Sequence, residues 1–94
     1  RYKELNDILT TMLNDERNKL RYFLEDIAEE DGELHKKVID ALSLFKNNYE
    51  IDDFKIPKKI RNVLINKNIL FLNPRKGTIK PQSYLIWNAI KKVL

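Results

Sequence analysis

Hydrophobic positions recur every three or four residues through the first third of the chain, from Tyr2 to Glu30. The recurring residues are Leu5, Ile8, Leu9, Met12, Leu13, Leu20, Phe23, Leu24 and Ile27. This spacing predicts an amphipathic helix. One long helix fits the pattern, and so do two helices with Asn14 or Asp15 capping the second. The apolar residues from Leu5 to Leu13 pack either on this domain or on another part of a longer protein.

A second helical pattern follows a break at Asp31-Gly32, where glycine suits a helix end or a tight turn. Its apolar residues are Leu34, Val38, Ala41, Leu42 and Phe45. Asn47-Asn48 ends this helix, and a short strand is possible at Tyr49–Ile51. The connection from Asn47 to Ile56 is longer than the turn of a usual helix-turn-helix. It therefore contains an extra short helix or strand, or the second helix of that motif is degenerate.

A third helix begins near Pro57, because proline is favoured in the first turn of a helix. Its apolar face carries Ile56, Ile60, Val63 and Leu64. Asn66-Lys67-Asn68 closes it, and its polar side carries lysine, arginine and asparagine.

A β-hairpin and a last helix follow. Ile69–Leu72 is a short apolar strand, Asn73–Gly77 has the composition of a turn, and Thr78–Lys80 is the returning strand. Pro81 ends the hairpin, as proline does at sheet edges. Ser83 can cap a final helix. The apolar residues of that helix are Leu85, Ile86, Trp87, Ile90, Val93 and Leu94.

This order of helices, basic helix, hairpin and closing helix is that of a winged helix. The predicted fold class is mainly α: a winged helix, which is a helix-turn-helix variant, with one β-hairpin and an extra N-terminal helix. Ninety-four residues make one domain. We expect a single winged-helix-like domain over 1–94, with a helical segment at 1–30 and the helices plus wing at 33–94. The chain starts with arginine instead of methionine, so we expect it to be a fragment of a longer chain.

Five residues on three adjacent elements should be buried together in the core. They are Ile60, Val63, Leu64, Phe71 and Trp87. The aromatic residues of the second half, Phe54 and Tyr84 included, are better explained by core packing than by base stacking.

Charge divides the chain into two unlike parts. Residues 1–53 hold eight Lys/Arg and all fourteen Asp/Glu, whereas residues 54–94 hold ten Lys/Arg and no acidic residue. The net charge is thus −6 in the first part and +10 in the second. So many like charges repel one another unless a polyanion or an acidic neighbour balances them. Nucleic acid and the acidic first part are the two candidates.

The basic helix and the wing supply the groups that a duplex requires. In winged helices one helix enters the major groove while the hairpin contacts the backbone or the minor groove. Cations bind phosphate, and arginine and asparagine can also read purine edges. The expected nucleic-acid-binding residues are Lys58, Lys59, Arg61, Asn62, Asn66, Arg75, Lys76 and Lys80.

The sequence offers no candidate catalytic, cofactor or metal site. Cysteine is absent, and the single histidine, His35, has no recognisable ligand or triad partners. The acidic clusters at Glu29–Asp31 and Asp52-Asp53 are read as solvated. No glycine-rich phosphate loop occurs, and no apolar run approaches the roughly 18 residues of a membrane helix. We expect a cytoplasmic domain that is not an enzyme and needs no cofactor.

Three short stretches carry a family resemblance. Between Asn68 and Ile90 the chain reads Asn-Ile-Leu-Phe-Leu-Asn-Pro, then Gly-Thr-Ile-Lys-Pro-Gln-Ser, then Leu-Ile-Trp-Asn-Ala-Ile. This resembles the C-terminal end of a group of archaeal P-loop ATPases of the signal-transduction type. The resemblance implies a winged-helix accessory domain that follows an ATP-hydrolysing core and contacts DNA or protein. It transfers no nucleotide-binding residue to this chain.

Two functions therefore remain open. The preferred one is binding of double-stranded DNA through the helix at 57–67 and the wing at 73–80. The alternative is a protein–protein interaction module of an ATPase, whose basic face meets an acidic partner or the parent ATPase core. The oligomeric state is left open.

Overall fold

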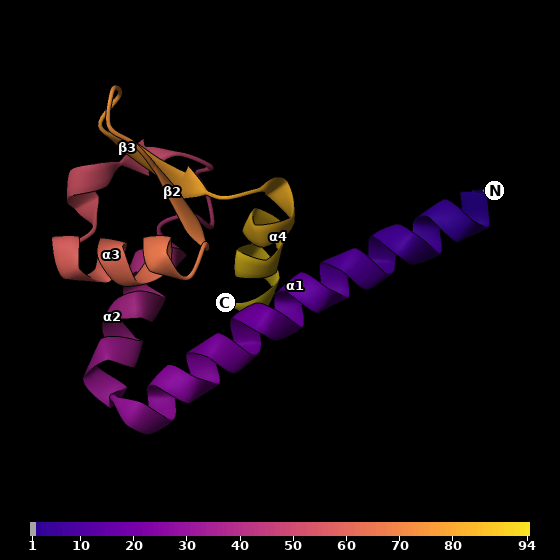
Figure 1. Cartoon of the computed structure of the whole chain (residues 1–94), viewed down its shortest axis with the longest axis horizontal. Helices are drawn as coiled ribbons and strands as arrows, with labels where there is room; N and C mark the ends of the chain where they lie inside the picture. Colours follow the sequence, from indigo (N-terminus) through magenta and orange to yellow (C-terminus); the bar gives the residue numbers. More distant parts are fainter. Residues whose placement is uncertain (1) are drawn as a thin grey trace.

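A computed structural model describes residues 2–94 of the chain and is drawn in Figure 1. The helices are α1 (Tyr2–Glu30), α2 (Gly32–Ser43), α3 (Lys58–Asn66) and α4 (Tyr84–Val93), with a 3-10 turn η1 (Asp53–Lys55). The strands are β1 (Ile51–Asp52), β2 (Leu70–Asn73) and β3 (Thr78–Pro81). Together they confirm the predicted fold class, a mainly helical winged helix with an added N-terminal helix. No helix among these residues is long and apolar enough to cross a membrane.

The first helix is continuous from Tyr2 to Glu30, so neither Asn14 nor Asp15 caps a second one. The predicted break at Asp31 is confirmed. The Asp31 carboxylate accepts a hydrogen bond from the Leu34 backbone N–H at 3.1 Å and so caps the start of α2. α1 packs against α2 and α4, but its N-terminal end continues past α4 and lies away from the other elements (Figure 1).

The long connection before α3 contains both a short strand and a helical turn. α2 ends at Ser43, earlier than predicted, although Phe45 is still fully buried. β1 pairs with β3 through Ile51 and Ile79, which gives a three-stranded antiparallel sheet in the order β1-β3-β2. η1 stands where the second helix of a helix-turn-helix would stand. That helix is reduced here to one 3-10 turn, which explains the length of the connection.

Buried side chains from all four helices and all three strands form one core. Fully or almost fully buried members include Val38, Leu42, Phe45, Ile60, Leu64, Leu70, Ile79 and Ile90. Of the five predicted core residues, Ile60 and Leu64 are buried. Val63 and Trp87 are half-buried, and the Trp87 indole N–H donates to the Phe45 carbonyl at 2.7 Å.

The prediction that Phe71, Phe54 and Tyr84 belong to the core is wrong. Their side chains are 45%, 76% and 70% exposed. Neighbouring strand residues point to opposite faces of a sheet, so burial of Leu70 turns Phe71 outward. Phe54 lies on the 3-10 turn η1, and Tyr84 is the first residue of α4.

Candidate nucleic-acid interface

The helix α3 presents one polar face to solvent and buries the opposite one. Ile60 and Leu64 point into the core. The exposed residues are Lys58, Lys59, Asn62 and Asn66. Three of these, at 58, 62 and 66, are four positions apart and therefore follow one another along the helix surface. The structure thus brings four of the predicted residues together on a face with two cations, two amides and no acidic side chain.

Arg61 is separated from this face. Its Nη1 lies 3.4 Å from the Asp53 Oδ2, and its side chain is only 20% exposed. The buried Arg61 Nε has no hydrogen-bond partner among the described residues. This ion pair ties the 3-10 turn η1 to the flank of α3, so the guanidinium is held toward the domain. Sequence reasoning did not anticipate the pair, because it depends on where η1 packs.

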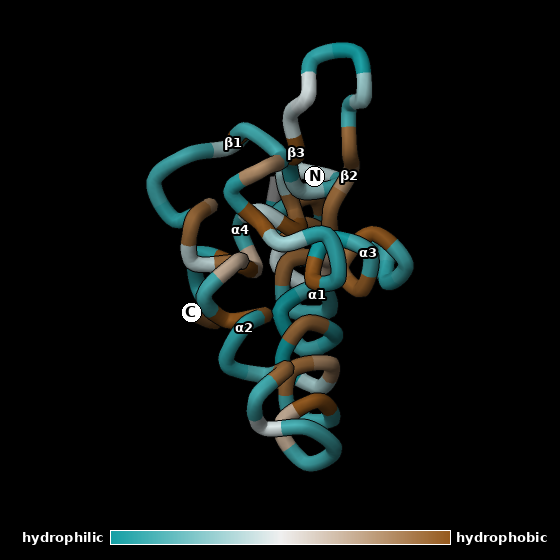
Figure 2. Tube along the Cα trace, turned by 90° about the vertical axis from the view of Figure 1, so that its left-hand side faces the viewer, coloured by the Kyte–Doolittle hydropathy of each residue, from teal (hydrophilic) through white to brown (hydrophobic). Residues whose placement is uncertain are grey.

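The tip of the β2–β3 hairpin exposes Arg75 and Lys76. The Asn73 Oδ1 accepts hydrogen bonds from their backbone N–H groups at 3.1 and 3.3 Å, which is the usual way in which asparagine stabilises a turn. Gly77 has φ 65°, a left-handed conformation that suits glycine. Figure 2 shows this tip as hydrophilic and clear of the helices. The predicted turn is therefore confirmed, and it holds two cations away from the body of the domain.

Lys80 is not at the tip but on the outer face of the sheet. It pairs in register with Phe71, and its Nζ lies 5.9 Å from the Phe71 ring centre and 5.8 Å from the Tyr49 ring centre. Distances of this size fit weak cation–π interactions. The sequence pattern predicted the wing to be one basic unit. The structure divides it into a basic tip, Arg75 and Lys76, and an aromatic face, where Lys80 lies beside Phe71 and Tyr49.

That aromatic face was not foreseen from the sequence. Tyr49 stacks on Tyr84 with ring centres 4.7 Å apart and meets the edge of Trp87 at 5.1 Å. The Lys91 Nζ lies 3.6 Å from the centre of the Trp87 ring. Burial raises the pKa of the Tyr49 hydroxyl above its ordinary value, and the charges of Tyr84 and Glu50 raise it further. Tyr49 therefore loses its hydroxyl proton less readily than an exposed tyrosine does.

The helices α1 and α2, which carry most of the acidic residues, lie close to the basic residues 54–94 without neutralising them. Among residues 2–94, the basic half contributes one ion pair, Arg61 with Asp53. Asp31 and Glu33, at the corner between α1 and α2, line a hollow together with Lys59 but form no ion pair with it. The acidic corner therefore borders α3 on the Lys59 side and leaves its outward face positive.

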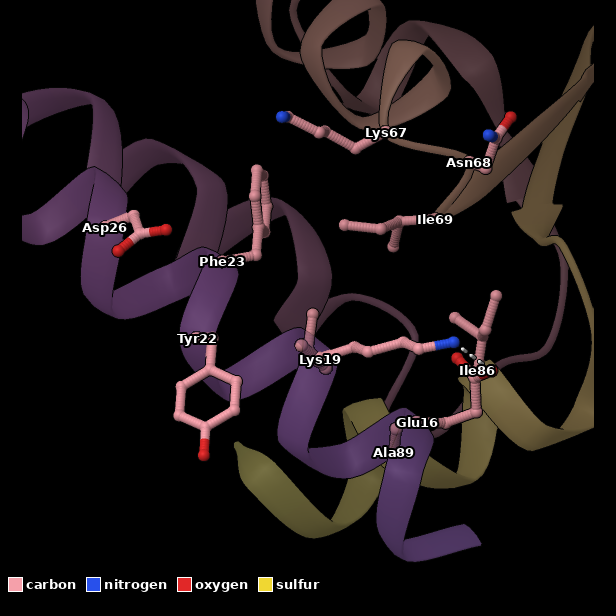
Figure 3. A pocket seen from close by; sticks show the side chains of 11 residues that line it. Glu16, Lys19, Tyr22, Phe23, Asp26, Lys67, Asn68, Ile69, Ile86 and Ala89 are labelled. Carbon is pink, nitrogen blue, oxygen red and sulfur yellow. Dashed lines mark ion pairs between the residues drawn. The ribbon is translucent and has the colours of Figure 1, made fainter. Parts of the chain in front are cut away.

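A larger hollow of about 410 Å³ lies between α1, α4 and the turn that follows α3. Its apolar residues include Leu20, Phe23, Ile69, Ile86 and Ala89. Figure 3 shows Phe23, Ile69 and Lys67 around it, with the Lys19–Glu16 ion pair of 3.7 Å at one end. Among the described residues no group of three or more His, Cys, Asp or Glu could hold a metal ion. The hollow suits an apolar side chain better than a metal or a phosphate.

Comparison with known proteins gives one family. Residues 6–94 match the family model described as "Uncharacterized ATP-binding protein MJ1010-like, C-terminal domain". In Methanocaldococcus jannaschii, the protein named "Uncharacterized ATP-binding protein MJ0632" is 65% identical over 94 residues, which is all of this chain and 26% of that protein. "Uncharacterized ATP-binding protein MJ1301" is 69% identical over 94 residues, again all of this chain and 24% of the relative.

A solved structure has the same fold. It is the crystal structure of the C-terminal domain of a possible ATP-binding protein from Methanocaldococcus jannaschii DSM 2661, with a TM-score of 0.88 and 45% sequence identity. The match covers 97% of this chain and 98% of that one. The chain spans about a quarter of the length of the curated relatives it matches.

Proposed function

The chain belongs to the MJ1010-like family of ATP-binding proteins as their C-terminal domain, and on this premise we propose that it contacts double-stranded DNA. The observation that carries the proposal is the outward face of α3, where Lys58, Lys59, Asn62 and Asn66 are exposed and the helix itself carries no acidic residue. Asp31 and Glu33 approach this face only on the Lys59 side. The basic tip of the hairpin supports it. We assign nucleotide binding to the other three quarters of such proteins, because this domain offers no phosphate-binding loop.

The role of each side chain in DNA contact follows from its chemistry. Lys58 and Lys59 lie at the start of α3, the end that approaches the bases in helix-turn-helix docking, and there they contact phosphate. Asn62 and Asn66 carry amides, which can pair with adenine through its N6 and N7 atoms. Arg75 and Lys76 at the tip bind a second stretch of phosphate. Arg61 positions α3 through its pair with Asp53, in place of the base reading expected from sequence alone.

Competition between two polyanions separates this function from its alternative. The isolated domain is titrated into fluorescent random-sequence duplex DNA at low salt, and the complex is then challenged with polyglutamate of matched charge. We expect duplex binding that polyglutamate displaces poorly, because regularly spaced phosphates fit both α3 and the wing. A domain that binds polyglutamate as tightly as DNA would favour the acidic protein partner. If the domain does not bind duplex DNA even at low salt, the proposal of DNA binding is wrong.

A further inference from the structure

The N-terminal half of α1 exposes four large apolar side chains, spaced so that they form a stripe along the helix. Leu5, Ile8, Leu9 and Met12 are 62%, 58%, 53% and 44% exposed. We call these four residues the α1 seam. Apolar residues scattered singly on a surface are ordinary, but a contiguous apolar stripe marks an interaction site. Figure 1 shows this half of the helix projecting beyond α4, where no other element of the domain covers it.

The seam faces the same way as the part of α1 that is already buried. Leu5 and Phe23 are 18 residues apart, as are Leu9 and Ile27. Eighteen residues are five full turns at 3.6 residues per turn, so the members of each pair point in one direction. Phe23 lines the hollow of about 410 Å³, and Ile27 is buried in the core. The seam and the hollow shown in Figure 3 therefore lie along one surface of α1, separated by the turn that carries Asp15 and Glu16.

We propose that this surface docks the ATP-binding part of the full-length protein. The family model describes a C-terminal domain, and the chain spans 26% of one relative and 24% of another, so the remaining three quarters contain the ATP-binding part and precede α1. That part enters the domain through the first turns of α1, next to the seam. A segment packed on the seam lies on the same side of α1 as α4 and can place an apolar side chain in the hollow.

A second copy of the domain fits the seam less well. The stripe covers Leu5 to Leu13 and is followed by Asp15 and Glu16, so the exposed part is only about two turns long. A helix-to-helix coiled coil needs an apolar stripe sustained over roughly three or four heptads. The docking surface is separate from α3 and the hairpin, and this inference does not depend on DNA binding.

Hydrogen exchange tests the docking in a full-length protein. MJ0632, whose C-terminal domain is 65% identical, is prepared with this 94-residue chain in place of its own domain. Amide exchange of residues 5–12 is compared between that protein and the isolated domain. We expect exchange to be about 10-fold slower or more in the full-length protein, because burying even one leucine side chain has an effect of that size.

Two aspartate variants distinguish docking from a general effect of the added chain. Leu9→Asp should return the exchange of residues 5–12 to the rate of the isolated domain, and Thr10→Asp, on an exposed polar neighbour, should not. Both place the same charge at neighbouring positions of α1, so the two variants differ in whether the charge lies on the seam. Equal exchange in the full-length protein and the isolated domain would overturn the proposal. So would an isolated domain that sediments as a dimer and becomes monomeric with Leu9→Asp, because the partner would then be a second copy.

Discussion

Two phenylalanines that look alike in sequence should respond very differently to truncation. Phe45 follows α2 and is fully buried in the core, whereas Phe71 lies on β2 with 45% of its surface exposed. Phe45→Ala should cost about 3–5 kcal/mol, which is typical for a buried phenylalanine. Only about half of the Phe71 side chain is buried in the folded domain. Full burial of such a side chain is worth about 1.5–3 kcal/mol, so Phe71→Ala should cost about 1 kcal/mol. A domain of 94 residues has roughly 5–14 kcal/mol in total, so only Phe45→Ala threatens the fold.

Urea titration followed by Trp87 fluorescence measures both changes. Trp87 is the only tryptophan, and its indole bonds to the Phe45 carbonyl at 2.7 Å, so its emission should report loss of the core. Phe45→Leu, which removes fewer atoms, gives an intermediate loss if Phe45→Ala does not fold. Equal costs for Phe45→Ala and Phe71→Ala would refute the reasoning. They would mean that Phe71 faces inward, as it would if β2 were shifted by one residue in the sheet.

Two further predictions concern single polar contacts. Asp31→Ala removes the cap of α2 and should lower the free energy of unfolding by about 1 kcal/mol in the same urea titration, while the exposed neighbour Glu30→Ala should change it little. Asp53→Asn breaks the ion pair with Arg61. The Arg61 and Asp53 side chains are 20% and 28% exposed, so we expect the free energy of unfolding to fall by about 1 kcal/mol. A Glu30→Ala loss as large as that of Asp31→Ala, or an Asp53→Asn domain as stable as the original, would contradict these assignments.

The sequence was sufficient wherever a local rule decides the structure. Asp31 followed by glycine fixes the boundary between α1 and α2, and Asn73 with Gly77 fixes the hairpin turn. The 3.6-residue period located α1, α3 and α4. It also identified four outward residues of α3, Lys58, Lys59, Asn62 and Asn66, because Ile60 and Leu64 define which side of that helix is buried. It wrongly grouped Arg61 with them.

Features that depend on packing between distant segments could not be predicted in the same way. The run Ile69–Leu72 is apolar at every position, so it gives no alternation to show that Phe71 faces outward. The Arg61–Asp53 pair requires η1 to fold against α3, and the stacking of Tyr49 on Tyr84 joins residues 35 positions apart. These contacts follow from the tertiary fold, and they are where the prediction of the site changed most.

Salt dependence of duplex binding tests the central proposal most directly. The logarithm of the binding constant for random duplex DNA is measured against the logarithm of salt concentration. Each phosphate contact contributes about −0.9 to the slope, so Lys58, Lys59, Arg75 and Lys76 together predict a slope of about −3.6. Lys58→Ala and Lys76→Ala should each make it less steep by about 0.9, and Lys36→Ala, an exposed lysine on α2, should leave it unchanged. An affinity that does not change with salt, or a slope that Lys36→Ala alters as much as Lys58→Ala, would contradict the account.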